Sequence, residues 1–217
     1  MTPDAVLFDC DGVIVDSESA TFQMLIDDLA RHGLPLTMLQ LETNYIGGTI
    51  ESVATRARAA GAVLPQDWVQ DFYPRMYAML AAGTPLMPGI LQVLDALDAG
   101  FIPYAVGSNG TMEKMQITLG QHGLIPRFHA VLSGQDIGRP KPAPDLYILA
   151  ALQCHADPAK CVVIEDSATG AAAALAAGIP CRGFAPHGPD TPPAARMAAM
   201  GIPLFHHMAD LPGLLNL

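Results

Sequence analysis

The chain has 217 residues, of which 51% are apolar, and it carries a formal net charge of −10. This composition supplies a large core, whereas the acidic balance and the lack of any Lys/Arg cluster argue against a nucleic-acid-binding protein. No apolar stretch approaches the ~20 residues of a membrane span, and no basic segment followed by an apolar one indicates a secretory signal.

The first predicted elements are one short strand and a long helical segment. Residues 4–9 contain an apolar run that ends in an aspartate, as expected for a buried strand. Residues 16–82 show apolar side chains at helical spacing, interrupted by Gly and Pro, and contain no convincing strand. We therefore expect residues 16–82 to form a helical insert after the first strand.

From about residue 86 the pattern alternates between helix and strand. Helices are predicted at 89–99, 111–122, 144–154 and 167–177, and strands at 102–107, 129–133, 161–165, 181–184 and 203–205. Residues 185–197, rich in Pro and Ala, are predicted to be loop. Strands separated by helices form parallel sheets with right-handed crossovers. The predicted fold class is therefore α/β: a Rossmann-like parallel-sheet core, residues 1–15 and 83–217, with an inserted α-helical cap, residues 16–82.

Two aspartates follow the first predicted strand. Asp9 and Asp11 are two residues apart, so on an extended strand their side chains point the same way. Two carboxylates at one point repel each other unless a hard cation lies between them or one keeps its proton. The alternative is an ordinary polar turn, because Asp and Gly12 both favour turns.

Three further polar motifs follow predicted strands. Ser108-Asn109-Gly110 suits phosphate oxygens, or is an ordinary turn and helix cap. Lys141, one of only three lysines, stands between two prolines that restrict its backbone. Glu165-Asp166 ends an apolar strand, where its acids could bind a metal or cap the next helix. Together the motifs predict metal-assisted phosphoryl transfer, in which a cation and a lysine neutralise phosphate while a carboxylate attacks.

The ordered motifs Asp9-Cys10-Asp11-Gly12, Ser108-Asn109, Lys141-Pro142 and Glu165-Asp166 resemble those of the haloacid dehalogenase-like (HAD) hydrolase superfamily. The insert at 16–82 resembles the type-1 helical cap of that superfamily. The resemblance implies that Asp9 is a nucleophile that forms an aspartyl-phosphate and that Asp11 is the general acid/base. It also implies that Ser108 holds phosphoryl oxygens and that Lys141 neutralises charge on Asp9 and the phosphoryl group.

The resemblance further implies a Mg²⁺ cofactor. The expected metal-binding residues are Asp9, Asp11 through its backbone carbonyl, and Asp166, with Glu165 either a ligand or just behind the ligands. To act as an acid, Asp11 must hold a proton while Asp9 stays ionised, and a cation beside Asp9 would separate the two pKa values.

Within the superfamily the chain resembles the branch of β-phosphoglucomutase and 6-phosphogluconate phosphatase. This implies a Mg²⁺-dependent phosphatase for a small phosphorylated metabolite, such as a sugar phosphate or 6-phosphogluconate. The expected substrate-binding residues are Gly12, Glu18, Gly48, Thr49 and Asn109. Cap residues Arg56 and Arg58 are weaker candidates, because a solvated helix face is the simpler interpretation of both.

Other activities on the same scaffold stay open. A phosphosugar mutase is disfavoured because Ile50 follows the Gly47-Gly48-Thr49 turn, where β-phosphoglucomutase carries an arginine. A phosphoglycolate-type phosphatase and a non-catalytic binding module are further alternatives. Asp11 argues against the metal-free dehalogenase branch, and the absence of lysine from 16–82 excludes the branch that uses a cap lysine.

The expected setting is cytoplasmic. The four cysteines, Cys10, Cys154, Cys161 and Cys181, form no C-x-x-C pair, and reduced thiols are the simplest interpretation. We expect a monomer or weak homo-oligomer whose partner is a small phosphorylated metabolite, with neither nucleic acid nor a membrane.

Overall fold

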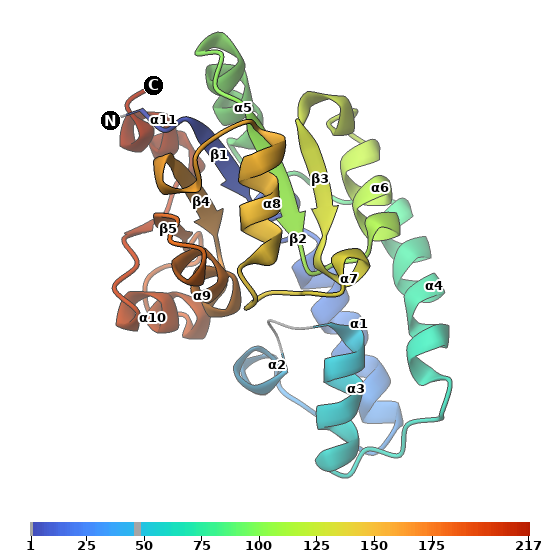
Figure 1. Ribbon diagram of the computed structural model, residues 1–217. Helices are drawn as coiled ribbons and strands as arrows, with labels where there is room; N and C mark the ends of the chain where they lie inside the picture. The colour runs from blue at the N-terminus through green and yellow to red at the C-terminus, as the bar shows by residue number, and fades with distance from the viewer. Residues whose placement is uncertain (1, 46–48) are drawn as a thin grey trace.

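The computed structural model describes residues 2–45 and 49–217 (Figure 1). A sheet of six parallel strands has the order β3-β2-β1-β4-β5-β6. The strands are β1 (Ala5–Phe8), β2 (Tyr104–Ser108), β3 (Ala130–Ser133), β4 (Cys161–Glu165), β5 (Cys181–Phe184) and β6 (Leu204–Phe205). The chain builds outward from β1 to β3 and then continues from β4 on the other side. This reversal places a topological switch point between β1 and β4, where open α/β sheets bind ligands.

Helices cover both faces of the sheet. Alternate residues of β1 serve different cores: Val6 and Phe8 belong to one hydrophobic cluster, and Ala5 and Leu7 to the other. Burial on both faces explains why the strand sequences are continuously apolar rather than alternating. The helices of this part are α5 (Ile90–Ala99), α6 (Met112–Gly120), α7 (Gly134–Ile137), α8 (Asp145–Gln153), α9 (Ala168–Ala176), α10 (Pro192–Ala199) and α11 (Leu211–Leu215).

The predicted α/β class and parallel sheet are confirmed. The prediction of a loop over residues 185–197 is wrong for residues 192–197, which are helical. Helix α10 occupies Pro192–Ala199, with Thr191 at its N-cap. Pro192 and Pro193 stand in the first turn, where backbone N–H groups have no helical partner and proline is well tolerated. The prolines therefore start a helix here instead of preventing one.

Four helices follow β1 as the predicted helical insert: α1 (Glu18–Arg31), α2 (Met38–Asn44), α3 (Ile50–Ala59) and α4 (Trp68–Ala81). They share a hydrophobic cluster of their own, which includes Leu25, Leu41, Val53 and Phe72. Figure 1 shows them beyond the ends to which the strand arrows point. The boundaries of 16–82 for the cap stay a prediction. No described helix has the length and apolar character needed to cross a membrane.

A buried carboxylate ties α1 to α4. Asp28 is 2% exposed and accepts hydrogen bonds from Trp68 Nε1 at 2.6 Å and Arg75 Nη1 at 2.9 Å, as well as from Arg31. Burial alone would raise the pKa of Asp28, but these donors lower it from 3.8 to about 2. The ionised carboxylate therefore stabilises the packing of the cap helices.

We expect Asp28→Asn to lower the free energy of unfolding at pH 7 by about 2 kcal/mol, because it removes the charge that three donors face. Since the folded-state pKa is depressed, this stabilisation is complete above the unfolded value of 3.8 and is lost as pH falls through about 2. Urea unfolding at several pH values measures the difference. Asp27→Asn, at an exposed position of the same helix, is the control, and an equal loss in both variants would contradict the prediction.

Candidate active site

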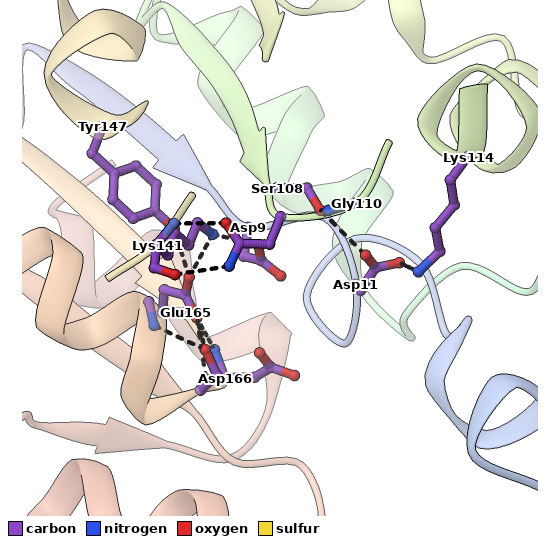
Figure 2. A network of polar contacts seen from close by, with 12 residues as sticks. Asp9, Asp11, Ser108, Gly110, Lys114, Lys141, Tyr147, Glu165 and Asp166 are labelled. Carbon is purple, nitrogen blue, oxygen red and sulfur yellow. Dashed lines mark hydrogen bonds and ion pairs between the residues drawn. The ribbon is translucent and has the colours of Figure 1, made fainter. Parts of the chain in front are cut away.

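Asp9 lies at the switch point, directly after β1. Its backbone N–H donates to the carbonyl of Ile164 on β4 at 2.9 Å, which continues the sheet by one residue. Its carboxylate accepts a hydrogen bond from Lys141 Nζ at 2.5 Å (Figure 2). The residue is only 8% exposed, so this charge is held in a largely dry environment.

Lys141 connects two acids. Its ammonium also donates to Glu165 Oε1 at 2.7 Å and lies 4.6 Å from the ring centroid of Tyr147. The side chain of Asn109 holds the Lys141 backbone from both sides: Nδ2 donates to the carbonyl at 3.0 Å, and Oδ1 accepts from the N–H at 2.7 Å. Asp9, Asn109 and Lys141 line one cavity. Asn109, which the sequence predicts to bind substrate, is therefore also a residue that positions Lys141.

Glu165 is fully buried and its carboxylate is saturated with donors. Oε1 accepts from Lys141 and from the Tyr147 hydroxyl, both at 2.7 Å. Oε2 accepts from Asp166 N–H, Ser167 N–H and Ser167 Oγ at 2.9–3.1 Å. These contacts favour a role in which Glu165 orients Lys141 and the turn of Asp166 from behind, one of the two alternatives expected from the sequence.

The packing around Glu165 depends on Gly170 of α9. A Cβ at position 170 would lie 1.6 Å from Glu165 Oε1. We expect Gly170→Ala to displace the carboxylate, to lower the free energy of unfolding by about 2–4 kcal/mol and to reduce catalytic turnover by ~100-fold. Thermal unfolding and phosphate release measure both effects. Gly213→Ala, a helical position with no atom within 4 Å of the new Cβ, is the matched control; similar behaviour of the two variants would contradict this interpretation.

Asp11 contacts a different lysine. Its carboxylate lies 2.7 Å from Lys114 Nζ, accepts from Ser108 Oγ at 3.3 Å and also accepts from Ser17. Figure 2 shows this group apart from the Asp9–Lys141–Glu165 cluster. Lys114 was not among the site residues predicted from the sequence. Its position on α6, shortly after Ser108-Asn109-Gly110 in a chain with only three lysines, was the available signal.

Without a cation, the protein side chains shift the pKa values of Asp9 and Asp11 in opposite directions. Burial is the largest cause that raises the pKa of Asp9, to about 7, with Lys141 opposing it and Glu165 and Asp11 adding to it. Burial also acts to raise the pKa of Asp11, but Lys114, Ser17 and Ser108 outweigh it and lower that pKa. The side chains alone therefore favour a proton on Asp9 rather than on Asp11.

Asp9, Glu165 and Asp166 together form a group that fits a hard cation. One ligand oxygen from each lies within 4.8 Å of the others. Burial, followed by the charges of Glu18, Asp9 and Glu165, raises the pKa of Asp166 well above its usual range. Carboxylate oxygens are the ligands that Mg²⁺ prefers, and a cation would relieve this repulsion. Because the carboxylate of Glu165 already accepts hydrogen bonds from other groups, Asp9 and Asp166 are the side chains of this group that remain available to bind the cation.

The lack of a side chain at Gly12 leaves room for the carboxylate of Asp166. A Cβ at position 12 would lie 1.9 Å from Asp166 Oδ2 and 3.2 Å from Glu18 Oε2, and the backbone φ of +76° also favours glycine. Burial, followed by the charge of Asp11, raises the pKa of Glu18 to about 8. Gly12 and Glu18 therefore lie beside the acidic cluster, and their predicted role in binding substrate stays a prediction.

A cavity joins these groups to the cap. Asp9, Asp11, Ser108, Lys114, Lys141 and Asp166 line its floor. Of the predicted cap contacts, Thr49 lines the cavity and also caps α3 by accepting from Ser52 N–H, whereas Gly48 lies outside the described residues. Arg56 and Arg58 do not line it; they donate to backbone carbonyls of the cap.

This arrangement of acids, lysine and hydroxyl at the ends of β1, β2 and β4 agrees with a family comparison. The model of the haloacid dehalogenase-like hydrolases matches residues 3–178. The chain belongs to the haloacid dehalogenase-like hydrolase family. It is a phosphoric monoester hydrolase, as its phosphatase relatives indicate.

Two curated HAD-like relatives match most of the chain. Hexitol phosphatase A of Escherichia coli is 31% identical over 192 residues, covering 86% of this chain and 84% of the relative. The 6-phosphogluconate phosphatase of Escherichia coli is 28% identical over 214 residues, covering 97% and 94%. Among solved structures, a HAD family hydrolase from Deinococcus radiodurans with bound phosphate and sodium is 35% identical, with a TM-score of 0.79 over 99% of this chain and 95% of that one.

Proposed function

We propose that this chain is a Mg²⁺-dependent phosphatase that hydrolyses a small phosphorylated metabolite, of the sugar phosphate type, through an aspartyl-phosphate on Asp9. The observation that carries the proposal is the position of Asp9. Its carboxylate accepts from Lys141 on one side and lies within 4.8 Å of Asp166 on the other, on the floor of a cavity that the cap closes.

In the first step, a carboxylate oxygen of Asp9 attacks the phosphorus atom and the ester oxygen leaves. Lys141 holds Asp9 in place and contributes positive charge where the phosphoryl group arrives. Ser108 Oγ, which accepts from the Gly110 N–H at 2.9 Å at the end of β2, is the proposed donor to the phosphoryl oxygens, together with neighbouring backbone amides. Glu165 keeps the lysine ammonium pointed at Asp9.

Asp11 is the proposed general acid/base. It donates a proton to the leaving oxygen and then takes one from the water that hydrolyses the aspartyl-phosphate. Its side-chain contacts favour the ionised form. Binding of a phosphate dianion next to Asp11 would raise its pKa, because a like charge disfavours ionisation, and would also compete for Lys114.

Mg²⁺ would be held by Asp9, Asp166 and the backbone carbonyl of Asp11, where it would neutralise phosphoryl charge and keep Asp9 ionised. The cap side of the cavity excludes water from the reacting groups. We also propose a cytoplasmic setting and a monomer or weak homo-oligomer; free thiols at all four cysteines are consistent with a reducing compartment.

Phosphate release from a panel of phosphomonoesters tests the proposal. We expect turnover with Mg²⁺, a loss of at least ~100-fold after treatment with EDTA, and recovery when Mg²⁺ is restored in excess. Full turnover in the presence of EDTA would contradict the metal requirement. Tight binding of phosphorylated compounds without phosphate release would instead favour a binding module.

A further inference from the structure

We propose that the leaving group of the substrate is uncharged: a small alcohol or polyol with an apolar face rather than a sugar acid or a bisphosphate. This inference rests on the proposed phosphatase function and narrows its substrate class. It follows from the charges on the floor of the cavity and from the side chains that the cap presents to it.

Both lysines on the floor of the cavity are already paired with carboxylates, so neither is available to bind a second anionic group. The cavity is lined by four carboxylates, from Asp9, Asp11, Glu18 and Asp166, and by two lysines. Lys141 is bonded to Asp9 and Glu165, and Lys114 is paired with Asp11 at 2.7 Å. Positive charge from a bound Mg²⁺ would be matched by the phosphate that is cleaved, so a carboxylate elsewhere on the substrate would remain uncompensated.

Apart from Glu18 at the start of α1, the cap covers this floor with apolar and neutral side chains. The apolar members from α1 are Phe22 and Leu25; those from α3 and α4 are Ile50, Val53 and Met76, and α4 also contributes Tyr73. Most of this lining would contact carbon atoms of a substrate. Tyr73 also supplies a hydroxyl, which contacts Gln135 Nε2 at 3.4 Å and would pair with a substrate hydroxyl.

The cap has cations, but each of its four arginines is engaged away from the cavity. Arg31 and Arg75 bind the buried carboxylate of Asp28. Arg58 donates to the carbonyl of Pro65 at 2.7 Å. Arg56 lies on the Tyr45 ring and donates to the carbonyls of Asn44 and Tyr45, at 2.9 and 2.8 Å. Residues 16–82 contain no lysine. Among the described residues of the cap, none that lines the cavity is therefore basic.

An anionic substituent in this cavity would lose its hydration and meet Glu18 without gaining a partner. A hydroxymethyl group at the same position loses less hydration and meets the hydroxyl of Tyr73. The lining therefore favours a hexitol or glycol monophosphate over a phosphorylated acid of the same carbon skeleton. This preference would separate the chain from its relative named 6-phosphogluconate phosphatase.

The test uses pairs of phosphomonoesters that differ only in this group. We would measure kcat/KM with Mg²⁺ for glucitol 6-phosphate against 6-phosphogluconate, and for 2-hydroxyethyl phosphate against phosphoglycolate. At least ~10-fold higher kcat/KM for the neutral member of both pairs is expected. Equal or faster cleavage of the acids would overturn this inference and leave the phosphatase function standing. No release from any of the four compounds, with Mg²⁺ and 4-nitrophenyl phosphate also tried, would overturn both.

A pair of variants at Ile50 tests whether the cap lining decides the charge preference. Ile50→Arg places a cation on the cap side of the cavity, and Ile50→Gln is the neutral control of similar length. The arginine variant is expected to raise the acid-to-neutral ratio of kcat/KM by at least ~10-fold relative to the glutamine variant. Equal ratios in the two variants would show that the cap lining does not decide the charge preference.

Discussion

Asp9→Asn is expected to reduce phosphate release by at least ~10⁴-fold, because an amide cannot form the proposed aspartyl-phosphate. The substitution is nearly isosteric and leaves Lys141 bonded to Glu165, so the fold should persist. Steady-state phosphate release measures the loss. Acid quenching during turnover, followed by reaction with hydroxylamine, should detect an acyl phosphate in the wild type and none in the variant.

The matched control is Asp4→Asn. Asp4 is exposed just before β1, and Asp9 follows the other end of the same strand. The same chemical change at position 4 is expected to leave turnover within about twofold, since surface substitutions seldom alter a distant site. More than a tenth of wild-type activity in Asp9→Asn would contradict a nucleophilic role for this residue.

Lys141→Met is expected to reduce both activity and stability. The Lys141 side chain is 4% exposed, and its ammonium lies between Asp9 and Glu165, at 2.5 and 2.7 Å. Its removal leaves two buried carboxylates without a counter-charge, which should lower the free energy of unfolding by about 3–5 kcal/mol at neutral pH. The loss of positive charge beside the phosphoryl group should lower kcat/KM by ~10³-fold.

The stability loss should shrink as pH falls, because protonation removes the repulsion between the two carboxylates. Burial already raises the pKa of Asp9 to about 7 while Lys141 opposes the shift, so without the lysine this pKa would lie higher still. Urea unfolding at pH 8 and pH 5.5 tests this. Lys160→Met, at an exposed position, is the control. Equal stability of the Lys141 variant and wild type at pH 8 would contradict the role of the ion pairs.

The strands and most helices could be predicted from local patterns. Strands β4 and β5 have the predicted residue bounds. For β4, burial on both faces of a parallel sheet leaves a continuous apolar signal. Helix α10 escaped prediction because its two prolines indicate a loop unless they stand in a first helical turn. Whether they do depends on Ala194 and Met197, which are buried against the sheet.

The candidate site positions were also visible in the sequence, because most of them lie at strand ends of one parallel sheet; Lys141 is separated from β3 by α7. Sequence spacing could not assign partners to them. The contact between Asp11 and Lys114, the support of Lys141 by Asn109 and the bonds that Lys141 and Tyr147 donate to Glu165 join residues from different elements. Such contacts depend on how the strand ends and helices pack, which leaves no periodic signal.

By itself, the sequence therefore determined the fold class, most of the order of the elements and the candidate reacting groups, since these follow from short-range periodicity and from residue type. The tertiary structure decided how charge is distributed among those groups. Without a cation, burial raises the pKa of Asp9, whereas Lys114, Ser17 and Ser108 outweigh burial and lower that of Asp11. It also turned the cap arginines away from the cavity, because Asp28 and the cap carbonyls bind them in three dimensions.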